Sequence, residues 1–531
     1  MLQTAACSKL ANVAGILYDS DMIDKNTESD PQRPRKRWRK TKWFYGIVLL
    51  YFAITIAAGV LWSAYSHEKF NEAVDPVLAR GEPLVWSDFA TEPVPDDQNG
   101  VILYESIMEG YVLQDPNCEF DNDAEPWSWG RYEIASRFIG HRGIRRKHAE
   151  ELRKLLDMAN RAFATCREAR HLGKFDWRID FNGKAAEFPI PPIQRFVRVA
   201  NLLHLAAIEA HEAGRDDDAI EYYLDGVALG DSMFKIPIMT SYLVGVAIHA
   251  VMDSSLEAIL PTMKIGDEPR AVSPDKLRGL IARLLDTSRC TEGLTRAIMG
   301  ERSVRYDICQ SLLKGKIPSD QLTPDEPEEY LTQGAGSSRV AKAGFDFFLA
   351  PLLRIDAAWL VKHDDAHVAA AEAATLPQSR RAFGPAARDR DERLARMWIS
   401  RPISEMLLGD CDRVFELHHR FLAGRQMAWA AIAIRLHQVD RGSRPIKLDD
   451  LVPDYLPEVP QDPMDEPGRK IRYVNDSDMP RLYSVGCDGR DDSGVYDDLY
   501  RSGTDNKEIL FFLTGRPERT KEQSDALYRD N

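Results

Sequence analysis

The chain has 531 residues and a mass of 60.1 kDa, which corresponds to about three or four domains of ordinary size. Hydrophobic residues make up 44% of the chain and charged residues 29%, a globular composition that excludes disorder over the whole length and the collagen-like, coiled-coil and disulfide-miniprotein classes. The net charge of −14 argues against general nucleic-acid binding, and the mean hydropathy of −0.37 excludes a multi-span transporter.

Residues 1–42 form a basic tail, which precedes an apolar stretch. The tail holds nine Lys and Arg against five Asp and Glu, and seven of these cations fall between Arg33 and Lys42. Trp43 to Tyr65 follows without a charged residue, and as a helix it measures about 34 Å, enough to cross a hydrocarbon core of about 30 Å. Aromatic residues lie at both ends of this stretch, as at membrane interfaces. We predict a single transmembrane helix over residues 43–65.

The charges on either side of this helix predict its orientation. Only Lys69 and Arg80 are basic in the twenty residues after Tyr65. Because the more basic flank stays in the cytoplasm, we expect the tail there and residues 66–531 on the far side of the inner (cytoplasmic) membrane. Six cysteines would then lie in an extracytoplasmic compartment, where they either form disulfides or remain buried thiols.

Beyond the membrane, helical patterns dominate. Residues 66–130 predict a short juxtamembrane helix and a proline-rich loop, and residues 131–411 an irregular α-helical ectodomain, because apolar residues recur at spacings of three and four. Within it, Ser273-Pro274 predicts the start of one helix. Residues 377–392 are charged and are expected to be exposed. A long helix is predicted over Asp412–Val439.

One helical pair lies between Ile193 and Leu229. Gly214 permits the turn between the two helices, and Asp216 is placed to cap the second one. The hairpin is similar to a tetratricopeptide unit, with small residues where the helices cross. No 34-residue period continues from it, so we predict a partly tetratricopeptide-like but irregular array.

Histidines are the first candidates for chemistry in the helical region. His363 and His367 have the spacing of two metal ligands on one helix face, but no third ligand is spaced with them, so we interpret them as part of a solvated polar segment. His204 is assigned to the core or its rim. The adjacent His418 and His419 point in different directions on a helix and are interpreted as incidental. No nucleophile-elbow, phosphate-loop or dinucleotide-binding motif stands in its required strand–turn–helix context, and no catalytic residue is predicted.

Four motifs follow the predicted helix near the C-terminus. They are D-x-G-x-x-P from Asp440, L-x-x-L-V-P from Leu448, V-P-x-D-P from Val459 and Y-S-x-G-x-D-G from Tyr483. In this order they resemble the C-terminal half of the type II secretion major pseudopilin, over about 90 of the 531 residues. The resemblance implies a small α+β module over residues 412–513, with residues 514–531 as a polar tail.

Strand patterns in this region point to the same kind of module. Ile471–Val474 and Leu482–Val485 predict two short strands of a hairpin, and Ile509–Leu513 a third, all lying on the helix predicted over Asp412–Val439. Unlike a pseudopilin, the chain begins with a basic tail, and its apolar helix lies far from the module. The whole arrangement resembles single-span membrane proteins of planctomycete-type bacteria.

An aspartate-rich loop follows the last motif. Five of the eleven residues between Asp488 and Asp498 are Asp, and carboxylates at this density repel one another unless they are solvated or share a cation. The pseudopilin resemblance implies a structural calcium site with Asp488 as a ligand, joined by Asp491, Asp492 and Asp498. A solvated acidic turn without calcium is the alternative.

The sequence therefore predicts a mainly α fold, with one transmembrane helix, a helical ectodomain and a small α+β module. Two functions remain open. The first is a membrane-anchored scaffold or binding protein that contacts other envelope proteins and no nucleic acid. The second is an extracytoplasmic hydrolase with an unrecognised metal or carboxylate site in the helical domain.

Overall fold

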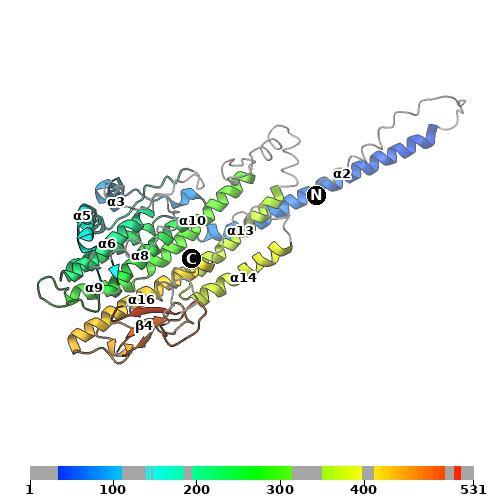
Figure 1. Ribbon diagram of the computed structural model, residues 1–531. Helices are drawn as coiled ribbons and strands as arrows, with labels where there is room; N and C mark the ends of the chain where they lie inside the picture. The colour runs from blue at the N-terminus through cyan, green and yellow to red at the C-terminus, as the bar shows by residue number, and fades with distance from the viewer. Residues whose placement is uncertain are drawn as a thin grey trace. The chain divides into compact units, whose positions relative to one another are not determined.

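The computed structural model is mainly helical over the residues that it describes (Figure 1). These are residues 34–109, 139–140, 143–144, 148–183, 194–313, 350–396, 412–476, 478–496 and 508–515. The chain divides into two compact units, Met1–Ala64 and Tyr65–Asn531. The finer division that the sequence predicts within the second unit stays a prediction.

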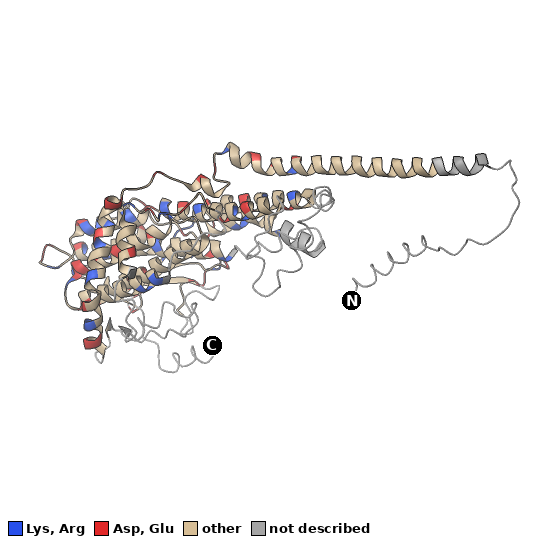
Figure 2. Ribbon diagram, turned by 90° about the horizontal axis from the view of Figure 1, so that it is seen from above, with Lys and Arg blue, Asp and Glu red and all other residues tan. Residues whose placement is uncertain are grey.

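The first long helix, α2, spans Pro34–Ala79. It contains the predicted transmembrane stretch and continues without a break through the expected juxtamembrane helix, with Pro76 in its last turn. Large apolar side chains between Trp43 and Tyr65 are exposed, and Figure 2 shows this part of the helix without charged residues. Of the most apolar 18-residue window in Trp43–Ala79, only 6% is buried. The chain therefore has an N-terminal apolar helix with the length and composition of a membrane anchor or a signal sequence.

The unit Tyr65–Asn531 begins with the last turns of α2, where Ala73, Val74 and Val77 are buried against Leu84 and Val361. Two short 3₁₀ helices follow, η1 (Trp86–Phe89) and η2 (Asp96–Gln98), and then helix α3 (Gly100–Glu109).

A buried Asn99 joins α3 to a later loop. Its side-chain oxygen accepts hydrogen bonds from the main-chain N–H groups of Val101 and Asp176, at 3.1 and 3.0 Å. The first of these satisfies a donor that a helix start leaves without a helical partner.

Six helices form the central array: α5 (Ala149–Leu172), α6 (Gln194–Glu212), α7 (Asp216–Met233), α8 (Met239–Ile259), α9 (Pro274–Leu285) and α10 (Ser288–Leu313). The predicted hairpin is confirmed as α6 and α7, with Gly214 in the left-handed conformation at φ 72°. Ser273 caps α9 by accepting from the N–H of Lys276, as expected.

Asp216 does not cap α7, contrary to the prediction. It is the first residue of the helix, and the N-cap is Arg215. The Asp216 carboxylate instead contacts His211 and accepts from the main-chain N–H of Lys264 at 3.1 Å. A buried aspartate at this position ties the hairpin to the turn after α8.

Helices α13 (Ala350–Ala371), α14 (Leu376–Arg396) and α16 (Asp412–Arg441) complete the helical part of the unit. Pro351 lies in the first turn of α13, where proline is tolerated. The segment expected to be charged and exposed belongs to α14, which buries Ser379 and Phe383. The helix packs against α13 and α16.

The predicted C-terminal sheet is confirmed. Strands β3 (Arg472–Val474), β4 (Arg481–Ser484) and β5 (Ile509–Phe512) are antiparallel and lie in the order β3-β4-β5, with Leu482 opposite both Tyr473 and Phe511. The 3₁₀ helix η7 (Leu448–Leu451) precedes them, and a small hairpin of β1 (Ile139–Gly140) and β2 (Gly143–Ile144) lies elsewhere in the chain.

Helix α16 is common to the array and the sheet. It packs against α8 and α9 and also against β4 and β5 (Figure 1). One hydrophobic core accordingly runs from Leu256 through Ile432 to Leu482 and Phe511. Of the six cysteines expected beyond the membrane, the structure describes four, and all of them are buried: Cys166, Cys290, Cys309 and Cys487.

Candidate functional site

A cavity of about 250 Å³ lies among four helices of the array. Its walls come from α7, α9, α10 and α16 and from the short link between α9 and α10. The residues that line it are Asp231, Ala282, Arg283, Asp286, Arg289, Cys290 and Arg425. Ala282, Asp286 and Arg289 are exposed at the rim, whereas Cys290 and Arg425 are buried.

Asp231 is the most heavily bonded group of the cavity. Its carboxylate lies 3.1 Å from Nε2 of His249, accepts from Nη2 of Arg283 at 3.0 Å, and lies 3.6 Å from Nη1 of Arg289. Burial tends to raise the pKa of Asp231, but the hydrogen bond from His249 and the charges of His249, Arg283 and Arg425 outweigh burial and hold the pKa well below its usual value. Asp231 is therefore a carboxylate whose charge is already balanced by protein groups.

Arg425 is buried with few partners. Its Nη2 donates to the main-chain carbonyls of Arg283 and Asp286, at 3.0 and 3.3 Å, and its guanidinium lies 5.8 Å from the ring centre of Phe421. Its Nε and Nη1 have no hydrogen-bond partner. Burial tends to lower the pKa of Arg425, but neighbouring acidic groups, the charged Asp231 among them, raise the pKa on balance, so the side chain keeps its charge.

Of the other titratable groups, Asp286 at the rim favours its charged form, because hydrogen bonds from Ser288 lower its pKa, whereas Cys290 and the groups behind the cavity favour their neutral forms. Burial raises the pKa of Cys290 to about 12, so its sulfur is a thiol rather than a nucleophilic thiolate. Behind the cavity, Tyr223 donates to Asp253 at 3.2 Å, and burial raises the pKa of both groups. The chemistry available in this cavity is the binding of a charged group by arginines.

The pair His363 and His367 is not in a solvated segment, so that interpretation is wrong. Both side chains are buried, with ring centroids 4.6 Å apart, and His367 stacks on Phe383 of α14 at 4.2 Å. The reason is that α13 turns this polar-looking face towards α14 and α16 rather than towards water. Among the described residues, no group of three His, Cys, Asp or Glu side chains is arranged to hold a metal ion.

His418 and His419 are also more than incidental. Both are fully buried, His418 Nδ1 lies 2.5 Å from the hydroxyl of Tyr242, and His419 Nε2 lies 2.8 Å from the hydroxyl of Ser379. Burial lowers the pKa of His418 to about 3, so it is neutral and links α16 to α8. The core placement of His204 is confirmed: its Nδ1 lies 2.6 Å from the hydroxyl of Ser255, and burial lowers its pKa to about 4.

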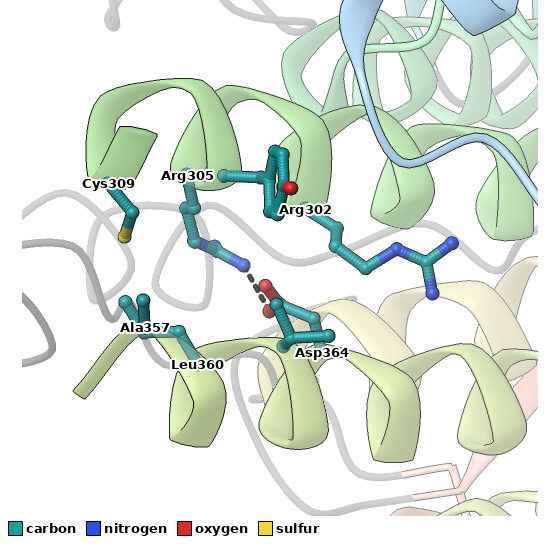
Figure 3. A pocket seen from close by; sticks show the side chains of 8 residues that line it. Arg302, Arg305, Cys309, Ala357, Leu360 and Asp364 are labelled. Carbon is teal, nitrogen blue, oxygen red and sulfur yellow. Dashed lines mark hydrogen bonds and ion pairs between the residues drawn. The ribbon is translucent and has the colours of Figure 1, made fainter. Parts of the chain in front are cut away.

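A second small hollow, between α10 and α13, is lined by Arg302, Arg305 and Asp364 (Figure 3). It has no room for a water molecule. Arg305 pairs with Asp364, and the fully buried Arg302 donates to Glu82 and to the carbonyl of Pro83, each at 2.9 Å. Burial tends to raise the pKa of Asp364, but the charge of Arg305 and the hydrogen bond to His367 outweigh it and lower the pKa. This cluster joins helices and offers no space for a ligand.

In the aspartate-rich loop, the described residues have partners within the protein. Asp491 contacts Nε of Arg472 at 3.0 Å and the hydroxyl of Tyr483 at 3.1 Å. Asp488 accepts from the N–H of Arg490, and the N–H of Asp492 donates to Glu508. Gly489 and Gly494 are left-handed, at φ 68° and 66°, as a tight fold of this loop requires. Asp498 lies outside the described residues, and the calcium site stays a prediction.

Sequence reasoning missed the residues of the cavity. Asp231, Arg283, Arg289 and Arg425 belong to four segments and follow no spacing motif. One pattern was available: between residues 421 and 434 of α16, Arg425 is the one charged residue, and this stretch buries Phe421, Leu422, Met427, Ala428 and Trp429. A buried charge at such a position either pairs with another group in the core or takes part in a binding site.

Comparisons with protein-family models, curated proteins and solved structures give no match to this chain.

Proposed function

We propose that the protein is a membrane-anchored binding protein whose helical unit faces an extracytoplasmic compartment and contacts other envelope proteins. The observation that carries this proposal is the contrast within α2. Its apolar, uncharged stretch is exposed, whereas its last turns are buried in the folded unit. A stretch of this length without charge is stable in lipid, and the folded unit follows it directly in the chain.

The orientation rests on the flanking charges. Seven cations stand in the ten residues before Trp43, against Lys69 and Arg80 in the twenty residues after Tyr65. This asymmetry favours a cytoplasmic N-terminus and an extracytoplasmic helical unit.

The protonation and hydrogen bonding of the groups in the cavity favour a role in binding over one in catalysis. Asp231 is charged but already bonded by His249 and Arg283, and Cys290 is a protonated thiol. A general base or nucleophile needs a free lone pair near its operating pH, and neither group supplies one. Arginine donors, in contrast, bind ligands without changing protonation state.

We extend the proposal to the C-terminal region, which we infer to be a pseudopilin-like module with a structural calcium ion in its aspartate-rich loop. The antiparallel sheet on α16 and the left-handed Gly489 and Gly494 support this inference. Calcium would hold the loop in place rather than take part in a reaction.

Topology reporters test the proposal. We expect a reporter that is active only outside the cytoplasm to give signal when fused after residue 531, and a cytoplasmic reporter at that position to stay silent. A matched variant with Arg35, Lys36, Arg37, Arg39 and Lys40 replaced by Gln should lose this preference, because the charge asymmetry is removed. The opposite reporter pattern in the unmodified chain contradicts the proposed orientation.

Crosslinking in intact membranes tests the partners. Envelope proteins that are recovered with the full chain, and lost when its helical unit is unfolded by a core substitution, support a binding role. Recovery of no partner under conditions in which the chain is folded contradicts it.

A further inference from the structure

The cavity beside Arg425 has a cationic interior and an open rim. Three arginines and two aspartates line it, and Arg289 at the rim is 61% exposed. Asp231 makes its direct contacts with Arg283, Arg289 and His249, and it acts on Arg425 through its charge, from beyond ion-pair distance. Within the described residues, no carboxylate lies within ion-pair distance of the Arg425 guanidinium.

The unmatched donors of Arg425 need an explanation. A buried donor without an acceptor costs about 1–3 kcal/mol, and more when the group is charged. Arg425 carries two such donors, Nε and Nη1, and its side chain lines the cavity. A protein core that keeps a charged group in this state gains from a ligand that supplies the missing acceptors.

We propose that this cavity binds the oxyanion group of a small solute, a carboxylate or a phosphate, with Arg425 as the principal donor and Arg289 at the entrance. The planar guanidinium presents paired N–H groups that match two oxygens of either anion. This inference rests on the proposed binding function and names its ligand chemistry.

The dimensions limit the ligand. Sites for drug-sized molecules measure about 300–1,000 Å³, so a cavity of about 250 Å³ admits a small anion or the charged end of a larger solute. The neutral thiol of Cys290 lies in the same wall and neither repels an anion nor attacks it.

The test measures binding to the full chain in detergent by calorimetry, with inorganic phosphate and with succinate as separate probes. Potassium chloride at equal ionic strength is the control for screening. We expect heat of binding and a rise in melting temperature with at least one probe and neither with chloride. Phosphate alone identifies a tetrahedral anion, succinate alone a carboxylate, and a response to both the shared oxyanion chemistry.

Two variants locate the site. Arg425→Gln should abolish binding, and Arg289→Gln, which changes an exposed side chain and leaves the core intact, should weaken it at least tenfold. Arg278→Gln, which changes an exposed residue of α9 that pairs with Asp275, is the matched control and should bind as the parent does. If Arg425→Gln does not fold, Arg289→Gln decides the outcome.

An equal response to phosphate, succinate and chloride overturns the inference, and so does unchanged affinity in Arg289→Gln. These results do not depend on orientation in the membrane. If calorimetry detects no anion binding while the topology and the partners are as proposed, only this inference fails. If the topology is wrong, the proposed function fails and the calorimetric result still stands.

Discussion

Within the described part of the chain, two helices are long and apolar enough to cross a membrane, and their surroundings differ. In α2 only 6% of the most apolar window is buried, whereas in α8 67% is buried. The stretch Trp43–Tyr65 carries no charge, but α8 carries His249, Asp253 and Glu257 along its length. Each of these three has a partner in the folded unit: Asp231, Tyr223 and the main chain of Phe512, respectively.

This comparison shows that hydropathy identifies an apolar helix but does not show whether lipid or protein surrounds it. A helix surrounded by protein on all sides is apolar almost all round, as a membrane helix is. The distinguishing features are ionisable groups with fixed partners and close contacts with other helices of the same unit. In α8, Gly245 lies so close to α7 that an added Cβ would sit 2.9 Å from the carbonyl of Gly230.

The largest expected effect comes from placing charge in each helix. In Ile54→Arg/Ile56→Arg, each arginine opposes membrane insertion by about 2.5–3.5 kcal/mol, so the chain should leave the membrane fraction with its helical unit folded. In Ile248→Arg, a charge enters the core of α8 without a partner, and the unit should unfold.

Membrane flotation and circular dichroism separate these outcomes. The expected roles of the two helices would be reversed by either of two results. One is that the α2 variant unfolds but stays in the membrane fraction, and the other is that the α8 variant stays folded but leaves the membrane fraction.

Low pH should reduce the stability of the folded unit through a histidine that contacts α8. The folded-state pKa of His204, which contacts Ser255 of α8, is about 4, below the value of about 6.5 expected in the unfolded chain. The unfolded chain binds the proton first, so the free energy of unfolding falls as the pH decreases from about 6.5 to about 4, by up to roughly 3 kcal/mol for this group. Denaturant titrations at pH 7 and 4.5 measure the loss.

Matched histidine variants assign that loss. His204→Gln should lower stability at every pH but reduce its dependence on pH, whereas His171→Gln, at an exposed position of α5, should leave the dependence unchanged. An equal pH dependence in the parent and in His204→Gln would show that other groups are responsible.

A smaller effect distinguishes the glycines of the two helices. Gly245→Ala should destabilise the unit by about 1–3 kcal/mol, because the added methyl meets the carbonyl of Gly230 and the ring of Phe234. Gly46→Ala in α2 meets no atom within 4 Å and should leave the melting temperature unchanged. Equal melting temperatures in the two variants would mean that α7 and α8 are less closely packed than described.

The smallest expected effect lies outside both helices, in the aspartate-rich loop. Calcium should raise the melting temperature of the full chain by a few degrees relative to chelator, about 1 kcal/mol or less, and Asp488→Ala should remove this response. Asp275→Ala, on the exposed start of α9, is the matched control. A response that survives in Asp488→Ala would place any calcium elsewhere.

Local patterns predicted much of the fold. Spacings of three and four predicted α6, α7 and most of α16, a serine before a proline predicted the start of α9, and short apolar or alternating runs predicted the three strands. These features depend on neighbours along the chain. Helix α8 was missed because burial on nearly all sides leaves no amphipathic stripe to recognise.

The candidate site could not be predicted from local sequence patterns. His363 and His367 lie next to two aspartates in the sequence, which is typical of an exposed segment, and only the packing of α13 against α14 places them in the core. Arg425 and Asp231 are almost 200 residues apart in the sequence and line one cavity because α7 and α16 both pack against α8. Contacts of this kind depend on the whole arrangement of helices.

The hydrogen bond between Glu257 and Phe512 has a consequence for self-association. Among the described strands, β5 lies at an edge of the sheet, and exposed edges can pair with strands of other chains and start aggregation. The N–H of Phe512 donates to Oε1 of Glu257 at 3.0 Å, so a carboxylate from α8 occupies this outward-facing donor. An incoming strand would have to displace a buried carboxylate before it could pair here, and the last strand is thereby protected against strand exchange between neighbouring copies.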